Sequence, residues 1–356
     1  MMALEHTPVF GICGFSGAGK TTLIIELVRR LHARGLASLV IKHDAHGLTV
    51  DRPGKDSDRF FAAGADVIAR DPVQGFCRSH SGDSDALDIL LAKVRPDYDV
   101  ILVEGHKMTP LPRKVWLRRH ARDRPPRACL PIALDLGRDD DRVAAALTWI
   151  EQSLEHLHQT APTLAGILVG GQSRRMGRSK QLLTYRGRTW LSCIVGAARN
   201  VTDGVVLLGS GPVPRSCSSL PRLPDADGKE GPLAGMCAAF RWRPDARWIF
   251  LACDGPLVTR EALQWLKDQS RPGVWAVQPQ LSANAVAEPF PGWYDFRTTA
   301  LLESACGPSW LSRHPRTATP VLPREHASAW LNFNSPADAR KLARMAPGRA
   351  PHPRRS

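Results

Sequence analysis

A glycine-rich turn near the N-terminus constrains the fold of this chain more than any other feature. Residues Gly14–Thr21 fit the pattern G-x4-G-K-[ST] without a mismatch, between the apolar run Val9–Cys13 and the helically spaced apolar residues of Thr21–His32. In such a turn the backbone N–H groups converge on a phosphate, and the following helix adds its positive N-terminal end. The sequence therefore predicts a nucleotide-binding P-loop between a buried strand and a helix.

The residue types of this turn indicate their roles. Lys20 is expected at the β- and γ-phosphates of a nucleotide and Thr21 at Mg²⁺. Glu104 follows the apolar run Val100–Val103, which places it at the carboxyl edge of the sheet, near the metal. The predicted metal ligands are Thr21 and Glu104, and the predicted nucleotide-binding residues are Gly14, Ser16, Gly17, Ala18, Gly19, Lys20, Thr21, Thr22 and Glu104.

Alternating apolar runs and amphipathic stretches predict an α/β fold with parallel sheets and helices on both faces. The first half has predicted strands at Val9–Cys13, Ala37–Ile41, Val100–Val103 and Pro131–Leu134, and a helix at Arg142–Leu157. His158–Thr163 is predicted to be a linker, after which the pattern restarts. The later strands are predicted at Leu164–Val169, Val205–Leu208 and Trp248–Ala252, with helices at Trp190–Arg199 and around Gly235–Phe240. We predict a P-loop NTPase-type domain at 1–158, a Rossmann-like α/β domain at 159–345 and a disordered basic tail at 346–356.

The net charge of +14 is concentrated in one half of the chain. Residues 1–158 contain 22 basic and 21 acidic side chains, whereas residues 159–356 contain 26 and 13. A basic field concentrates anionic ligands, and phosphorylated small molecules and nucleic acids are both candidates. Nucleic acid is disfavoured as a partner, because the chain has three tyrosines and no helix-turn-helix or RNP-like signature.

The eight cysteines indicate a reducing compartment. They form no CxxC pair and are scattered through apolar segments, which argues against a zinc site or a disulfide framework. The sequence contains no apolar run of about 18 residues, so it predicts no membrane-spanning helix. Residues 1–10 do not resemble a signal peptide. We expect a cytoplasmic protein without a membrane partner.

A second glycine-rich loop, residues 168–180, follows the first predicted strand of the second half. It contains the adjacent pair Gly170 and Gly171 but no G-K-[ST], so it is not a second P-loop. Adjacent glycines let the backbone approach a nucleotide, whose phosphates the N–H groups can bind. Arg175 and Lys180 are spaced to close over a triphosphate and to stabilise charge on a leaving pyrophosphate.

The first half resembles the molybdopterin-guanine dinucleotide biosynthesis adapter family. That family combines a GxxxSGxGKTT loop with KHxxH, DxPGKDS and VEG segments, and this chain has GFSGAGKTT, KHDAH, DRPGKDS and VEGHK in the same order. The resemblance implies GTP binding, weak GTPase activity at most and a supporting role beside a guanylyltransferase. It suggests that Asp56 assists Thr21 and Glu104 around Mg²⁺. His43 and His46 remain open between a metal site and two ordinary loop histidines.

The second half resembles the molybdenum cofactor guanylyltransferase family over roughly Thr163–Arg344. The loop at 168–180 is similar to the signature LxGGxSxRMGxxK, and GPLAG at 231–235, CDGP at 253–256 and NFNSP at 332–336 follow in the family's order. The resemblance implies a nucleotidyltransferase fold and GTP as the substrate. The chain departs from the family pattern at three positions, each of them a small change: Val169, Gly255 and Ser335.

Position and resemblance together assign roles in this half. Asp254 ends an apolar strand and is expected to bind Mg²⁺ near Asn334, while Asn332 is expected at the pterin phosphate. Asp225 is the better candidate for recognising guanine, and Asp227 is a rival. The predicted catalytic residues are Arg175, Lys180 and Asp254. The predicted nucleotide-binding residues are Leu168, Gly170, Gly171, Ser173, Lys180, Asp225, Gly231, Gly235, Asn332 and Asn334.

The implied reaction transfers GMP from GTP to molybdopterin, with release of pyrophosphate. The alternatives are a cytidylyltransferase or another NTP transferase acting on the same pterin, and a nucleotide-dependent cofactor carrier or chaperone. Residues 278–287 match no family element, so the specificity for the pterin is the least constrained feature. Candidate partners are molybdoenzyme apoproteins or their chaperones, and a second copy of the chain through the N-terminal domain.

Overall fold

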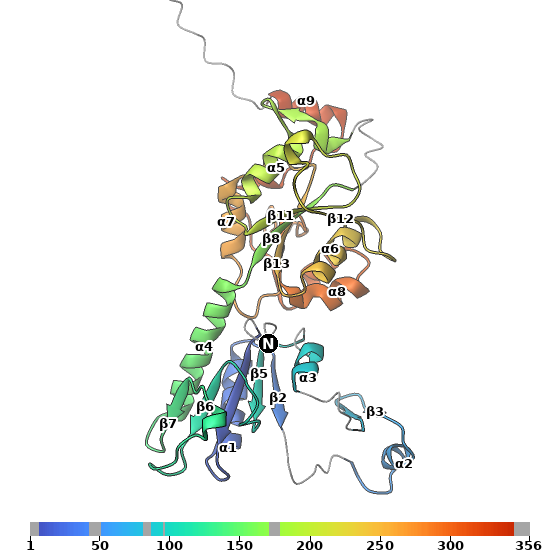
Figure 1. Cartoon of the computed structure of the whole chain (residues 1–356). Helices are drawn as coiled ribbons and strands as arrows, with labels where there is room; N and C mark the ends of the chain where they lie inside the picture. The colour runs from blue at the N-terminus through green and yellow to red at the C-terminus, as the bar shows by residue number, and fades with distance from the viewer. Residues whose placement is uncertain (1–6, 43–50, 81–86, 95–96, 171–178, 345–356) are drawn as a thin grey trace, which may run out of the picture. The chain divides into compact units, whose positions relative to one another are not determined.

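The computed structural model describes residues 7–42, 51–80, 87–94, 97–170 and 179–344. The chain divides into two compact units, Met1–Ser153 and Leu154–Ser356, here called the N-terminal and C-terminal units (Figure 1). Both are α/β, as the sequence predicts. The division falls inside helix α4 (Arg142–Thr160), five residues before the boundary proposed at 158.

The N-terminal unit is built on a five-stranded parallel sheet in the order β2-β5-β1-β6-β7. The strands are β1 (Val9–Gly14), β2 (Ser38–Lys42), β5 (Val100–Glu104), β6 (Lys114–Leu117) and β7 (Leu134–Leu136). Helix α3 (Leu87–Val94) packs on one face, where Leu87 and Leu91 meet Val9 and Ile101. Helix α4 covers the other face, where the ring of Trp149 meets that of Phe10 edge-on at 5.3 Å. The P-loop leads from β1 into α1 (Lys20–Ala33).

Two details of this sheet differ from the sequence prediction. The strand predicted at Pro131–Leu134 begins only at Leu134, because pairing with β6 runs from Leu134 to Leu136. Strand β6 was not predicted, since it has four residues and begins with a lysine. Lys114 is nevertheless fully buried, and its Nζ donates to the carbonyl oxygen of Cys129 at 2.9 Å. A lysine can therefore start a buried strand when a backbone carbonyl oxygen accepts a hydrogen bond from its ammonium group.

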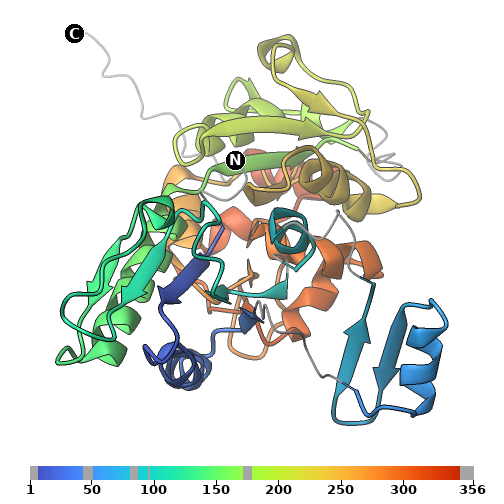
Figure 2. The same ribbon diagram turned by 60° about the horizontal axis from the view of Figure 1, so that its bottom comes forward.

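A small subdomain lies between β2 and α3 in the chain. It consists of α2 (Asp56–Ala62) and the antiparallel hairpin β3 (Val67–Arg70) and β4 (Gly75–Arg78). Arg78 holds it together, because its guanidinium pairs with Asp58 at 2.9 Å and lies 3.8 Å from the centre of the Phe61 ring. Figure 2 shows the hairpin and α2 side by side.

The C-terminal unit is built on a seven-stranded sheet in the order β12-β11-β8-β13-β15-β14-β16. The strands are β8 (Thr163–Leu168), β11 (Gly204–Leu208), β12 (Arg222–Leu223), β13 (Arg247–Ala252), β14 (Ala276–Val277), β15 (Gly292–Tyr294) and β16 (Thr317–Ala318), beside a small hairpin of β9 (Thr184–Tyr185) and β10 (Arg188–Thr189). The first four strands are parallel, and β15 runs antiparallel to β13. The sheet is thus mixed, with its parallel part around β8.

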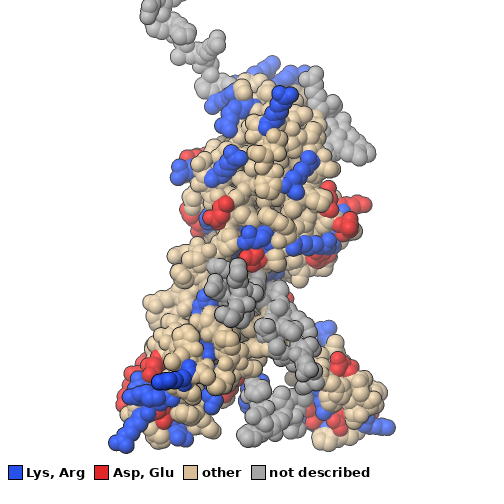
Figure 3. Space-filling model, in the orientation of Figure 1, with Lys and Arg blue, Asp and Glu red and all other residues tan. Residues whose placement is uncertain are grey.

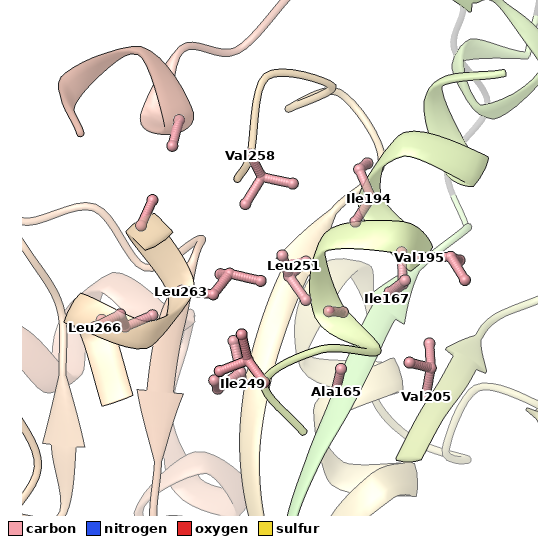
Figure 4. Packing of buried hydrophobic residues seen from close by; sticks show 14 of the residues in the cluster. Ala165, Ile167, Ile194, Val195, Val205, Ile249, Leu251, Val258, Leu263 and Leu266 are labelled. Atoms are coloured by element: carbon pink, nitrogen blue, oxygen red, sulfur yellow. The ribbon is translucent and has the colours of Figure 1, made fainter. Parts of the chain in front are cut away.

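Alternate residues of the central strands face two separate cores. Ala165, Ile167, Ile249 and Leu251 pack under α5 (Trp190–Ala198) and α7 (Arg260–Asp268), as Figure 4 shows. The intervening residues pack under α6 (Gly231–Trp242) and α8 (Thr299–Ser304). On this second face Gly166 has no room for a side chain, since a Cβ there would lie 2.7 Å from the Phe250 ring. The last helix is α9 (Pro336–Arg344).

Basic side chains are spread over the face of the C-terminal unit that Figure 3 shows. Acidic side chains lie among them, so the positive excess of this half forms no single continuous patch on that face. Within the described residues, no helix has both the length and the apolar character that crossing a membrane requires.

The segment predicted as a linker, His158–Thr163, is folded. Helix α4 continues to Thr160 and β8 begins at Thr163. His158 is partly buried in the C-terminal unit, where its Nε2 lies 3.1 Å from Ser270 Oγ and its carbonyl oxygen accepts from Arg247. Burial, and then the charge of Arg247, lower the pKa of His158 to about 4.

This burial predicts an acid-sensitive fold. Between the unfolded pKa of about 6.5 and the folded pKa of about 4, the unfolded chain binds a proton that the folded chain does not. The free energy of unfolding should therefore fall as the pH drops through this window, by up to about 3 kcal/mol. Denaturant unfolding of the wild type and of His158→Asn between pH 7 and 4 measures the difference. Parallel pH curves for the two proteins would contradict the prediction.

Candidate functional site

A cavity of about 510 Å³ opens at the carboxyl edge of the parallel strands in the C-terminal unit. The ends of β8, β11 and β13, the start of α6 and the segment before β15 surround it. Its lining consists of Leu168, Gly170, Lys180, Leu208, Asp225, Gly231, Pro232, Ala252, Cys253, Asp254, Glu288, Pro289, Phe290 and Asn332. Carboxyl edges of parallel strands are the usual ligand sites of open α/β sheets.

Lys180 and Asp254 form the charged centre of this cavity. Lys180 Nζ lies 3.2 Å from Asp254 Oδ2 and also donates to the side-chain oxygen of Asn334. Both members of the ion pair are mostly buried, with side chains 15% and 18% exposed. Asp254 follows β13, and its carbonyl oxygen accepts from the amide of Phe333 at 3.0 Å. Its other carboxylate oxygen, Oδ1, is buried and has no hydrogen-bond partner among the described residues.

Asn334 is positioned by the start of α9. Ser335 Oγ accepts from the amide of Asp338, and Asp338 Oδ2 accepts from the amides of Asn334 and Ser335. This reciprocal pattern is a capping box, which fixes the entry of the chain into the helix. The hydrogen bond from the Ser335 hydroxyl, and then that from the Asn334 amide, hold the pKa of Asp338 below its usual value. Ser335 thus supplies the hydroxyl that caps this helix.

Gly170 and Asp225 meet at the end of β11. A Cβ on Gly170 would lie 3.9 Å from Asp225 Oδ2. Gly209, which the sequence analysis did not single out, lies between them with φ +100°, and a Cβ there would lie 3.0 Å from Gly170 N and 3.4 Å from Asp225 Oδ1. Gly209 directly follows the apolar strand β11, and this position in the sequence could have identified it as a candidate residue. Of the two rivals for recognising guanine, Asp225 lines the cavity and Asp227 does not.

The structure brings most of the predicted residues of this half to the cavity. Leu168, Gly170, Lys180, Asp225, Gly231, Asp254 and Asn332 line it, and Asn334 contacts Lys180. Gly235 does not line the cavity; it packs inside the fold, where a Cβ would lie 2.7 Å from the Leu168 side chain. Its role toward the nucleotide stays a prediction. The predicted residues Gly171, Ser173 and Arg175 lie outside the described residues.

Two further lining residues carry titratable groups. Burial raises the pKa of Glu288, to which the sequence analysis assigns no role. Burial, and then the neighbouring charge of Asp254, raise the pKa of the Cys253 thiol to about 11. Cys253 Sγ donates to the side-chain oxygen of Gln181. The thiol is therefore protonated near neutral pH.

The predicted P-loop of the N-terminal unit is the turn between β1 and α1. Gly17 and Gly19 have φ of +73° and +88°, a conformation that favours glycine. Thr21 Oγ1 donates to Glu104 Oε1 at 2.9 Å, so the two predicted metal ligands are adjacent. Lys20 Nζ donates to the carbonyl oxygen of Phe15 at 3.0 Å, which keeps the ammonium group over the turn.

Arg142, at the start of α4, supports the P-loop and was not predicted. Its guanidinium donates to three carbonyl oxygens, those of Ala18 at 2.8 Å, Gly137 at 2.6 Å and Arg118 at 2.5 Å. In a trans peptide the C=O and N–H point in opposite directions. Holding the Ala18 oxygen toward Arg142 therefore turns the Gly19 N–H the other way.

The remaining metal predictions for this unit find no support. His43 and His46 lie outside the described residues. Asp56 begins α2 and is exposed, and among the described residues it makes no hydrogen bond or ion pair with Thr21 or Glu104. The described part of the chain also holds no cluster of three or more His, Cys, Asp or Glu side chains that could form a metal site.

Two different known families match the two halves of the chain, and each match contains one of the two sites described above. Residues 9–133 match the family described as molybdopterin guanine dinucleotide synthesis protein B. Residues 165–347 match the family described as the MobA-like NTP transferase domain.

Individual relatives match one half or the other. The molybdopterin-guanine dinucleotide biosynthesis adapter protein of Haemophilus influenzae is 35% identical over 167 residues, which cover 43% of this chain and 93% of the relative. The probable molybdenum cofactor guanylyltransferase of Bacillus licheniformis is 33% identical over 38% of this chain and 70% of its own length. A molybdenum cofactor biosynthesis bifunctional protein of Synechocystis is 27% identical over 37% of this chain and 39% of the relative.

The close approach at Gly209 predicts a specific effect of an added methyl group. Gly209→Ala should displace Gly170 or Asp225 and lower the free energy of unfolding of the C-terminal unit by ~1–3 kcal/mol. Gly187→Ala is the matched control, because Gly187 also has a positive φ but has no neighbouring atom within 4 Å of a Cβ. Denaturant unfolding of both variants tests this. Equal losses would show that backbone strain alone, and not the contact with Gly170 and Asp225, governs the position.

Proposed function

Because the chain belongs to the molybdopterin guanine dinucleotide synthesis protein B family over residues 9–133 and to the MobA-like NTP transferase family over residues 165–347, we propose that it makes a guanine dinucleotide cofactor. The chain is a nucleotidyltransferase. Its C-terminal unit transfers GMP from GTP to the phosphate of molybdopterin and releases pyrophosphate. Its N-terminal unit binds GTP at the P-loop and serves as the adapter.

The cluster of Lys180, Asp254 and Asn334 carries this proposal. It places one cation and two oxygen-bearing side chains at a cavity that Gly170 and Asp225 also line. Phosphates need a cation and backbone N–H groups, and a guanine ring needs an acceptor for its N–H donors. The cavity offers the cation at Lys180 and the acceptor at Asp225.

The residues present fit Mg²⁺. Asp254 Oδ1 is a buried carboxylate oxygen without a hydrogen-bond partner among the described residues. The side-chain oxygen of Asn334 accepts a hydrogen bond from Lys180, which also pairs with Asp254. Mg²⁺ prefers oxygen ligands and is commonly held by one or two carboxylates together with substrate phosphates and water. When bound, Mg²⁺ would neutralise charge on the phosphates. In the N-terminal unit Thr21 and Glu104 would hold the corresponding ion.

The reaction needs alignment and charge neutralisation from the protein rather than a general base. The attacking group is a phosphate monoester oxygen, which is already ionised near pH 7 because its second pKa is about 6. Lys180 is held at the cavity by Asp254 and Asn334 and can turn its ammonium group to the triphosphate. Arg175 is proposed to close over the same phosphates. Asp225 is proposed to accept the N–H groups of guanine, which orients the α-phosphate toward the pterin phosphate.

One assay tests the proposal against its closest rival. The purified chain is incubated with molybdopterin and Mg²⁺ in parallel with GTP, CTP and ATP, and the products are identified by mass spectrometry. The proposed function requires the guanine dinucleotide as the main product. The cytosine dinucleotide as the main product would instead identify a cytidylyltransferase, and no dinucleotide with any nucleotide would exclude a transferase of this pterin.

Removal of the carboxylate at Asp254 should abolish most of the turnover. Asp254→Ala and Asp254→Asn are expected to lower kcat at least about 100-fold, because a metal-binding carboxylate contributes several kcal/mol to the stabilisation of charge. Glu261→Gln, an exposed carboxylate at the start of α7, is the control and should retain the parent rate. Pyrophosphate release measures both. Parent-like turnover by Asp254→Ala would refute the role of Asp254.

Loss of the P-loop lysine should affect the N-terminal unit alone. Lys20→Ala is expected to weaken GTP binding at the P-loop by about 10-fold or more, since the ammonium group would no longer reach the β- and γ-phosphates. Arg29→Ala removes an exposed cation from the same helix and serves as the control. Calorimetric titration with GTP of both variants and of the parent, each in the Asp254→Ala background that suppresses turnover, measures the change. GTP affinity equal to that of the parent would contradict a nucleotide role for this loop.

A further inference from the structure

The sheet order arranges three carboxylates of the C-terminal unit along one edge. Asp225 Oδ2 would lie 3.9 Å from a Cβ on Gly170, which follows β8, and Asp254 follows β13, the next strand in the sheet. Strand β15 is the next neighbour of β13 and runs antiparallel to it, so the residues before β15 lie at this same edge. Glu288 is in that segment and lines the cavity. Asp254 therefore lies between Asp225 on one side and Glu288 on the other.

Glu288 is held in place by its backbone while its carboxylate is unused. Its amide donates to the carbonyl oxygen of Pro279 at 2.7 Å, and the neighbouring Ala287 bridges to Gln280. Phe290, two residues further, packs against the core beneath α6 and α8. Among the described residues, no hydrogen bond or ion pair reaches the half-buried carboxylate of Glu288. Burial alone raises its pKa, which agrees with the lack of a cation beside it within the described ranges.

A carboxylate without a cation is a poor neighbour for phosphate. The proposed reaction brings a triphosphate and a phosphate monoester to Lys180 and Asp254, and a further negative charge beside them would be repelled. The position of Glu288 instead suits a neutral group that is rich in N–H donors, because a carboxylate accepts two such bonds well. If the phosphate of molybdopterin lies near Asp254, the pterin ring can extend past Asp254 to Glu288.

Guanine and a pterin share the same donor edge. Each carries a 2-amino group beside a ring N–H next to a carbonyl, so a carboxylate can accept two parallel hydrogen bonds from either one. We propose that Glu288 recognises the amino-pyrimidinone edge of the pterin, as Asp225 recognises that of guanine, and that the two carboxylates set the two ring specificities from opposite sides of Asp254. This inference rests on the proposed function. It makes Glu288 a specificity-determining residue for the second substrate.

Paired ring analogues and paired variants test the assignment. Inosine triphosphate is GTP without its 2-amino group, and lumazine is pterin with the amino group replaced by oxygen. In the wild type, transfer should favour GTP over inosine triphosphate, and pterin should inhibit more strongly than lumazine. Glu288→Gln should raise the KM for molybdopterin about 10- to 100-fold and remove the preference for pterin over lumazine, with the KM for GTP unchanged. Asp225→Asn should do the reverse.

The outcomes separate this inference from the proposed function. A wild type that transfers no nucleotide to molybdopterin refutes the function, whatever the variants do. An active wild type with an unchanged KM for molybdopterin in both Glu288→Gln and Glu288→Ala refutes the inference alone. A shift in the Mg²⁺ requirement of Glu288→Gln, with the pterin preference intact, would also overturn it, because Glu288 would then serve the metal. Thermal unfolding of the near-isosteric Glu288→Gln variant confirms that it is folded.

Discussion

The parallel pairing of β8 with β11 on one side and β13 on the other is the constraint on which the C-terminal unit depends. It brings the ends of three strands to one edge, and with them Gly170, Gly209 and Asp254. The pairing tolerates little change, because Gly166 in the middle of β8 leaves room for the Phe250 ring and for Leu208. Close packing of the sheet and placement of the cavity therefore have the same cause.

Charge is the second constraint, since both proposed substrates are anions. Individual cations in fixed positions, rather than the net charge, provide for these anions. Lys180 is held at the cavity by Asp254 and Asn334, and Arg142 holds the carbonyl oxygens around the P-loop. Both cations are anchored through oxygen atoms before any nucleotide arrives. Such preorganisation reduces the reorganisation that binding would otherwise require. The carboxylates in the C-terminal cavity must then face either a metal or the N–H donors of a ring.

Much of the fold followed from local sequence pattern. The strands that flank each glycine turn, and the helices after them, lie within one or two residues of their predicted bounds, because a buried strand and an amphipathic helix each impose a period on the sequence. The errors lie where the pattern is short or interrupted. Strand β6 begins with a buried lysine, and the supposed linker at His158 is a helix end packed around Arg247 and Ser270. Tertiary contacts that stabilise these polar residues leave no periodic signal.

The sequence by itself determined that this chain has two glycine-rich segments, each after a buried strand, and which residue types surround them. Those features depend on neighbours within about ten positions. Only the tertiary structure decided which distant residues share a site: Lys180 meets Asp254 across 74 positions and Asn334 across 154, and Asp225 rather than Asp227 lines the cavity. It also placed Gly235 in the packing between helix and sheet and Glu288 at the edge of the cavity. Strand order and side-chain direction set these distances, and neither is encoded in local spacing.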